Sequence, residues 1–319
     1  MKQEKGAVAV IIAILIVVLI GMAAYAIDVG SLYHERRHLQ TVADAAALAG
    51  AQELPESPGN AVSKASEYAE FHGVSAENLE ISIGNELTVN DKIMVTSKNP
   101  DPPLYFAGVL TKGPTPVAAY AEAIIATPLQ INNVVPWGVV EQDGWGIGET
   151  VVLMYDEPHP EGGTGWFGAL DLPSYSGTGG ASGYRENIEK GANIDLTEGQ
   201  TVWTEQGKMV GPTGQGIDDR VDTWYGFDYL VTQNSSGLYT LQYNEPQFII
   251  VPIVEPLDDK ETGKRDFKIL RFEPFILMDF NHKGQEAEVI GKFIDIALVQ
   301  NYGEVGAVGQ GLRVIRLTK

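Results

Sequence analysis

The features of this chain that could serve catalysis or ligand binding are histidines, paired acidic residues and a few glycine-rich stretches. His34 and His38 stand four residues apart, a spacing that puts two imidazoles on one face of a helix and suits metal binding. Arg36 and Arg37 lie between them, and their positive charges would repel a cation. We therefore interpret this face as a solvated or headgroup-level surface.

Other patterns of catalytic or metal-binding residues are missing. The sequence has no H-E-x-x-H motif, no G-x-S-x-G elbow and no Walker loop, and "GWGIGE" at 144–149 is interpreted as a turn. The acid pairs Asp218–Asp219 and Asp258–Asp259 lack the spacing of a calcium-binding loop and are interpreted as exposed turns. Because the chain has no cysteine, a thiol nucleophile is excluded. The sequence predicts no catalytic residue, no metal site and no cofactor.

Composition bounds the class of protein. The formal net charge of −20 comes from 42 acidic residues against 22 Lys and Arg, without a basic stripe that could neutralise a phosphate backbone. Nucleic acid is therefore excluded as a partner. The 36 glycines and 17 prolines are concentrated after residue 100, which predicts many turns and a mainly β distal region.

An uncharged apolar run occupies residues 7–27. As a helix it is about 31 Å long, which matches a hydrocarbon core of about 30 Å. A cleaved secretory signal is the alternative, because "GMAAYA" at 21–26 resembles a cleavage site. We prefer a retained membrane span, since the helical pattern continues beyond this run.

Beyond the span, small and apolar residues recur every three or four positions as far as residue 51, with Arg36 in the one heptad position that is not apolar. Pro55 and "SPGN" at 57–60 end this helix. Two interpretations stay open: the stripe packs on the chain's own next domain, or it bundles with helices of neighbouring subunits. The residues predicted to pack are Leu32, Leu39, Ala43 and Ala46.

The chain as a whole predicts an α+β fold in three parts. Residues 1–54 are the transmembrane and continuing amphipathic helix. Residues 55–127 are a small α/β module with a short helix, a hairpin, a further helix at 104–110 and a third strand. Residues 128–319 are a mainly antiparallel β domain with one helix near 183–191, because short apolar runs alternate there with Gly, Pro, Asn and Asp turns.

The N-terminal sequence resembles a known family. An apolar span leads into "AIDVGSLY" at 26–33 and then "RRHLQTVADAAALAGA" at 36–51, which is similar to the N-terminal segment of TadE/TadG-like proteins of bacterial Flp (tight adherence) pilus systems. This resemblance covers about the first 50 residues. A looser similarity to the distal region of some TadG-like proteins lies in "GWFGALDL", "YRENIEKG", "TEQGKMVGPTGQGIDDRV" and "VPIV".

The resemblance implies a membrane-tethered, pseudopilin-like component of pilus assembly. In that family a prepilin peptidase cuts pilins and pseudopilins after a glycine, and a glutamate stands five residues further on. Here the candidate cleavage point lies between Gly6 and Ala7, but the fifth following residue is Ile11, so processing stays open. The von Willebrand A domain of longer TadG proteins is expected to be absent, because "DLPSYS" at 171–176 does not fit its D-x-S-x-S metal motif.

We therefore expect a non-enzymatic, single-pass membrane protein with a cytoplasmic N-terminus and an extracytoplasmic bulk. Lys2 and Lys5 before the span nearly balance Arg36 and Arg37 after it. The orientation is thus inferred from the short N-terminal flank and from the Gly-rich, cysteine-free region, whose composition is typical of exported domains. The expected partners are the lipid bilayer, other Tad/Flp pilus-assembly proteins, and a second copy of the chain through the N-terminal helix.

Two rival functions remain. A cell-surface hydrolase would use a pair among the 42 acidic residues, which only geometry can identify. A cell-surface adhesion or ligand-binding protein would bind a glycan or a protein through exposed aromatic residues of the β domain. The candidates for that role are Trp137, Trp145, Trp166 and Trp224.

Overall fold

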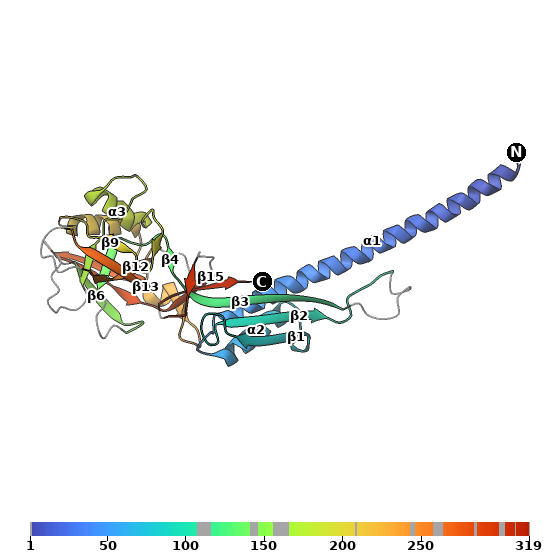
Figure 1. Ribbon diagram of the computed structural model, residues 1–319, viewed down its shortest axis with the longest axis horizontal. Helices are drawn as coiled ribbons and strands as arrows, with labels where there is room; N and C mark the ends of the chain where they lie inside the picture. The colour runs from blue at the N-terminus through green and yellow to red at the C-terminus, as the bar shows by residue number, and fades with distance from the viewer. Residues whose placement is uncertain are drawn as a thin grey trace. The chain divides into compact units, whose positions relative to one another are not determined.

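The computed structural model has an α+β fold, as the sequence predicts, and divides into two compact units (Figure 1). Unit 1 comprises Met1–Asn85, Lys92–Ile124 and Leu317–Lys319, and unit 2 comprises Glu86–Asp91 and Ile125–Arg316. The three-part division drawn from the sequence stays a prediction. The structure describes residues 2–106, 116–140, 146–155, 166–207, 209–242, 246–257, 264–283, 286–299, 304–309 and 311–318.

Unit 1 is built on one long helix, α1 (Lys2–Ala51), whose N-terminal part projects beyond the strands of the unit (Figure 1). The helix continues without a break because the apolar run and the stripe after it contain no proline. It ends four residues before Pro55, as predicted. A second helix, α2 (Pro58–Phe71), begins with a proline, whose missing N–H costs nothing at a helix start.

The sheet of unit 1 is antiparallel. β2 (Lys92–Asn99) lies between β1 (Leu79–Gly84) and β3 (Val117–Pro128). The hairpin of β1 and β2 carries both helices: α1 packs on β2 and α2 packs on β1. A single turn of 3-10 helix, η1 (Ala76–Asn78), precedes β1. Alternate residues of β2 are buried, as expected for a strand with one face on the core. The core of the unit is rich in alanine, so helices and sheet approach closely.

The larger sheet of unit 2 closes on itself. Its strand order is β12-β5-β7-β6-β14-β13-β9, and β12 also pairs with β13, so six strands form a barrel and β9 extends it from β13. Most neighbours are antiparallel, but β5 and β12 are parallel, as are β6 and β7. Closure pairs both edges of each of these six strands. The bounds are β5 (Trp137–Val140), β6 (Thr150–Tyr155), β7 (Trp166–Ala169), β9 (Thr201–Trp203), β12 (Phe248–Pro256), β13 (Asp266–Lys283) and β14 (Glu286–Phe293).

The barrel is filled by side chains. Trp137, Phe167 and Phe275 are fully buried in one core cluster, to which the helices α3 (Gly180–Lys190) and α4 (Val210–Arg220) also contribute. The helix predicted near 183–191 is α3. A second long helix was not predicted: α4 holds Asp218 and Asp219, so this acid pair is exposed, as expected, but the expectation of a turn was wrong. The other pair, Asp258–Asp259, lies outside the described residues.

The remaining strands of unit 2 do not belong to this sheet: β17, β15, β11 and β10 are neighbours in that order, β4 pairs with β8, and β16 pairs with β3. A separate apolar cluster joins these strands to the barrel, with Phe267, Ile276 and Leu312 among its members. A short helix, α5 (Phe227–Leu230), directly precedes β10. The strands are β4 (Gln130–Ile131), β8 (Leu196–Thr197), β10 (Val231–Gln233), β11 (Tyr239–Leu241), β15 (Ile296–Val299), β16 (Val305–Gly306) and β17 (Leu312–Leu317).

Candidate functional site

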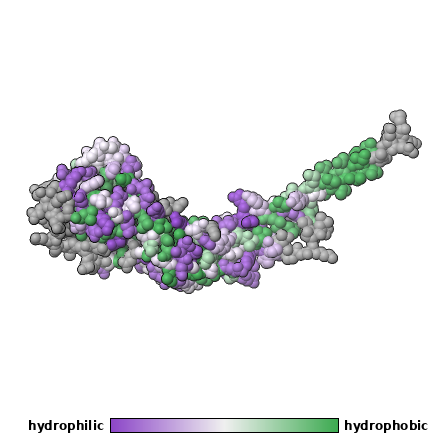
Figure 2. All heavy atoms as spheres, viewed as in Figure 1, coloured by the Kyte–Doolittle hydropathy of each residue, from purple (hydrophilic) through white to green (hydrophobic). Residues whose placement is uncertain are grey.

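The projecting part of α1 is apolar on all sides. From Val8 onward the helix is long and apolar enough, by length and composition, to cross a membrane, and its most apolar stretch is not buried. Figure 2 shows this part of the molecule as a continuous hydrophobic surface. A helix that is apolar all round needs lipid or protein around it.

The first charged residue after the span, Asp28, is almost completely buried. Its carboxylate accepts the backbone N–H of Tyr105 at 2.8 Å and that of Phe106 at 3.1 and 3.2 Å. Three residues further along the helix, the hydroxyl of Ser31 donates to the carbonyl oxygen of Pro103 at 3.1 Å. Two side chains of one helix face therefore hold this loop against α1.

Sequence reasoning missed this contact and expected a helix at 104–110. Residues 104–106 are not helical, and the N–H groups of Tyr105 and Phe106 donate to the carboxylate of Asp28; residues 107–110 lie outside the described part of the chain. One signal could have found the contact. An acid directly after a charge-free run needs hydrogen-bond donors if it is to sit at the edge of lipid, and Asp28 is that acid.

Further along α1, polar side chains connect the helix to β2. The hydroxyl of Ser97 donates to the carbonyl oxygen of Leu39 at 2.7 Å. One turn earlier, Asn99 Nδ2 donates to a carboxylate oxygen of Glu35 at 2.7 Å. The helix is thus fixed to the sheet at successive turns.

The residues predicted to pack lie in this same region. Leu39, Ala43 and Ala46 are buried and Leu32 is half-buried, where α1 packs on α2 and β2 of its own unit. Packing against helices of other subunits stays a prediction. So does cleavage between Gly6 and Ala7, which lie within α1 and whose side chains are outside the described part.

The basic and histidine residues after the span face outward. Arg36, His34 and His38 are exposed, and the guanidinium of Arg37 lies 5.8 Å from the centre of the Tyr33 ring. Within the described ranges, no group of three or more His, Asp or Glu side chains could hold a metal ion. Such an exposed basic stretch favours contact with water or with anionic headgroups.

Unit 2 carries an open cavity of about 390 Å³ beside β9. Trp203 and Asp171 line it together with residues 172–174 and 177–179, and Trp203 is 51% exposed. Lys264 forms an ion pair with Asp171 at this place. An aromatic face beside polar groups can hold a sugar ring or a peptide side chain. Sequence reasoning missed Trp203, although Val202 beside it is buried and strand alternation turns its neighbours outward.

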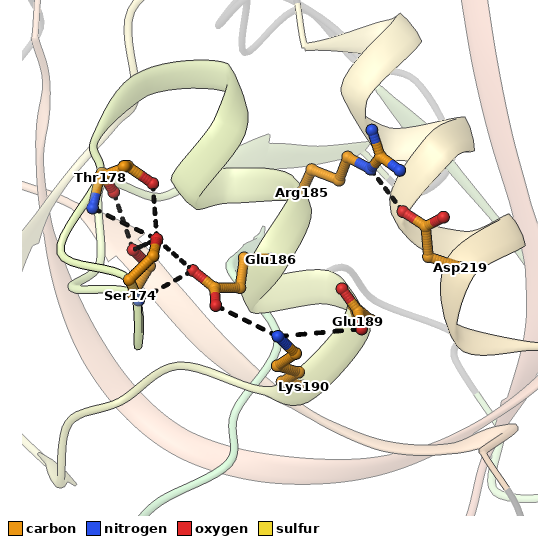
Figure 3. A network of polar contacts seen from close by, with 8 residues as sticks. Ser174, Thr178, Arg185, Glu186, Glu189, Lys190 and Asp219 are labelled. Carbon is orange, nitrogen blue, oxygen red and sulfur yellow. Dashed lines mark hydrogen bonds and ion pairs between the residues drawn. The ribbon is translucent and has the colours of Figure 1, made fainter.

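One wall of the cavity is a loop tied to α3 (Figure 3). Glu186 accepts the backbone N–H of Ser176 at 3.1 Å and its hydroxyl at 2.5 Å, and Lys190 Nζ lies 3.3 Å from the other carboxylate oxygen. The Ser176 hydrogen bonds, and after them Lys190, lower the pKa of Glu186 to about 2. The hydroxyl of Ser174 also donates to the carbonyl of Thr178 at 2.8 Å, so the loop is held at both ends.

Arg220, the last residue of α4, joins segments of unit 2. Its guanidinium donates to the carbonyl oxygens of Pro246 at 2.7 Å, Ile188 at 2.8 Å, Glu189 at 3.1 Å and Phe248 at 3.2 Å. Burial lowers the pKa of Arg220 to about 10, so it stays charged at neutral pH. Two of these acceptors lie in the last turn of α3, where the helix dipole favours a cation.

The tryptophans proposed for ligand binding differ in their surroundings. Trp137 is fully buried, because β5 turns it into the barrel, so the expectation that it binds an external ligand was wrong. Trp224 is 40% exposed. Trp145 and the side chain of Trp166 lie outside the described part of the chain.

A single apolar span continued by a packed helix is typical of single-pass membrane-anchored proteins. Residues 6–53 match the model of a family described as "Putative Flp pilus-assembly TadE/G-like". The resemblance read from the sequence is thereby confirmed for this segment, which supports a role related to Flp (Tad) pili. No curated protein and no solved structure matches the chain.

Proposed function

We propose that the chain is a membrane-anchored, non-enzymatic and pseudopilin-like component of Flp/Tad pilus assembly, with an exported β-rich unit 2. The observation that carries the proposal is the continuity of α1, which supplies both the span and the face that packs in unit 1. Because no break separates these parts, a displacement of the span is passed directly to the packed unit. The family match over residues 6–53 supports the connection to pili.

In this function the residues of α1 have separate tasks. Residues 8–27 hold the chain in the lipid bilayer, and Leu39, Ala43 and Ala46 fix the helix to the body of unit 1. The exposed part of the helix is the surface through which other Tad/Flp pilus-assembly proteins, or a second copy, would bind. The small side chains in the stretch 43–51 permit the close contact of α1 with α2 and β2 within unit 1.

Fractionation with N-terminal sequencing of the native protein tests the anchor. We expect the chain in the membrane fraction, beginning at Met1 if it is uncut or at Ala7 if a prepilin peptidase processes it. A soluble polypeptide beginning near Ile27 or Asp28 would contradict the proposal, because the span would then be a removable export signal.

The orientation can be tested by cysteine labelling, because the natural chain has no cysteine. The variant Thr232→Cys places one thiol on an exposed position of unit 2. In cells stripped of their outer envelope, a membrane-impermeant maleimide should label it, whereas Gln3→Cys in the uncut chain should react only after lysis. The reverse pattern would show that unit 2 lies in the cytoplasm.

A second function, ligand binding at the cell surface, is favoured by the cavity at Trp203. The full-length protein in nanodiscs is tested on a glycan array beside two variants, Trp203→Ala and Trp224→Ala. Binding lost only in Trp203→Ala would support adhesion through this cavity. Deleting the gene and restoring it with Trp203→Ala separates the two functions, since pilus assembly should return and adhesion should not.

A further inference from the structure

We propose that residues 103–106 form a second membrane contact, in which Tyr105 and Phe106 enter the lipid headgroup region beside the end of the span. The inference rests on the membrane-anchoring part of the proposed function. The proposal adds a membrane-contacting surface from a distant part of the chain. Tyr105 lies 77 positions after Asp28 in the sequence, and its N–H donates to the Asp28 carboxylate.

The first observation is the position of the clamp. Asp28 directly follows the last residue of the apolar run, so its level on α1 is the boundary between hydrocarbon and headgroups. A bare carboxylate there would be poorly solvated, and the N–H groups of Tyr105 and Phe106 compensate for the lost water. The loop is therefore held at the membrane surface by the same residue that ends the span.

The second observation is the kind of side chain exposed at this level. Tyr105 is 65% exposed and Phe106 is 44% exposed, although both are aromatic. Tyr25 stands one turn before Asp28 on the same helix face and is also strongly exposed. Aromatic rings, and tyrosine above all, are enriched at the membrane interface, where an apolar ring and a polar hydroxyl are both satisfied.

The third observation is the lack of charge in the loop. Residues 102–111 contain no Asp, Glu, Lys or Arg in a chain whose net charge is −20. An uncharged, aromatic stretch that continues an apolar span fits lipid, whereas the acidic remainder of the chain is repelled from an anionic membrane surface. Continuity with the span favours lipid over a second copy of the chain as the occupant.

Lipid-dependent quenching in proteoliposomes tests the proposal with the full-length chain. Because the chain lacks cysteine, each variant carries one bimane label: Tyr105→Cys in the loop, Val17→Cys in the span, and Phe71→Cys on an exposed position at the end of α2. Nitroxide lipids carry the quencher either on the headgroup or near the end of the acyl chain. We expect the headgroup quencher to act on label 105, the deep quencher on label 17, and neither on label 71.

The clamp is tested in the same labelled background. The double variant Asp28→Ala with Ser31→Ala removes both hydrogen-bonded contacts between α1 and the loop, so quenching of label 105 should fall to the level of label 71 while quenching of label 17 is unchanged. Asp28→Asn keeps one acceptor oxygen and should preserve part of the quenching.

The outcomes separate the inference from the anchoring on which it rests. If label 17 is quenched and label 105 of the natural Asp28 chain is not, the second contact does not exist and the anchor stands. If neither is quenched, both are wrong. The emission of label 105 is also measured at increasing protein density in the vesicles, with the amount of quencher lipid held constant. A change of emission with protein density would assign the loop to a second copy of the chain and overturn the lipid contact.

Discussion

Single polar residues hold the helices and loops of unit 2 in place, and their effects can be measured separately from unit 1. The five tryptophans of the chain all lie within the residue range Ile125–Arg316 of unit 2. Tryptophan fluorescence during urea unfolding of the full-length protein in detergent therefore reports on this unit. Arg220 and Glu186 are the residues for which the structure makes the clearest expectations.

Replacing Arg220 by methionine should strongly destabilise unit 2. The substitution removes hydrogen bonds from a buried cation to carbonyls of four residues, so we expect a loss of about 3 kcal/mol or more in the free energy of unfolding. Arg185→Met is the matched control on the neighbouring helix, because Arg185 makes an exposed, solvent-screened ion pair with Asp219 and its loss should change the urea midpoint little. Equal urea midpoints for the two variants would contradict a structural role for Arg220.

Glu186 should make the stability of unit 2 depend on acid pH. Its folded pKa of about 2 lies below the ordinary value of 4.5, so the unfolded chain binds this proton more readily than the folded one. The stabilisation is complete above the unfolded pKa and is lost as pH falls from about 4.5 toward 2. Glu186→Gln should unfold at lower urea than the natural protein at neutral pH, and the difference should shrink in that window.

The control for this experiment is Glu189→Gln. Glu189 approaches Lys190 only at 3.9 Å in an exposed ion pair, so its urea midpoint should differ little from that of the natural protein at any pH. If the difference in urea midpoint between Glu186→Gln and the natural protein stays constant down to acid pH, the charge of Glu186 does not contribute to stability.

At the scale of elements, the contact between α1 and the body of unit 1 depends on a glycine. A Cβ at Gly50 would lie 2.5 Å from Ile93 Cδ1 and 2.8 Å from the carbonyl oxygen of Ala61, so Gly50→Ala forces the helix away from α2 and β2. We expect Gly50→Ala to lower the stability of unit 1 by about 1–3 kcal/mol, measured as faster hydrogen exchange in peptides of α2 and β2. Gly30→Ala on the same helix has open space and should stabilise it by about 0.5–1 kcal/mol. Equal exchange in the two variants would contradict this packing.

The elements that sequence analysis predicted are those with local signals. The extent of α1 follows from helical spacing and Pro55, and the hairpin of β1 and β2 follows from alternating apolar residues. α4 has no such signal, because three glycines and a proline in its eleven residues indicate a turn. The structure explains one of them: a Cβ at Gly216 would lie 2.7 Å from that of Ile188, so glycine permits close contact between α4 and α3.

The parts that sequence analysis could not supply are contacts between distant residues. Pairing of β12 with both β5 and β13 closes the barrel, and Trp137, expected among the exposed aromatic residues, is buried inside it. The candidate site shows the same limit. Asp28 is visible in the sequence as an isolated acid, but its partner Tyr105 is found only when β2 and β3 lie beside α1.

At the scale of the whole molecule, charge and apolar surface act against each other at a membrane. The net charge of −20 repels the chain from an anionic lipid surface, so electrostatic attraction cannot retain it there. Retention must come from residues 8–27, whose twelve Val, Leu and Ile side chains contribute about 0.3–0.6 kcal/mol each, or about 4–7 kcal/mol together.

This balance predicts how many charges the span tolerates. The natural chain should stay in the membrane pellet after washes with high salt and with alkaline carbonate. One arginine, in Val17→Arg, costs about 2.5–3.5 kcal/mol and should leave the chain inserted. Two arginines, in Leu15→Arg with Leu19→Arg, cost about 5–7 kcal/mol, which cancels the favourable sum, so this variant should appear in the supernatant. The double variant with methionine at both positions should stay in the pellet, whereas release of the natural chain by salt alone would show that it is only peripherally bound.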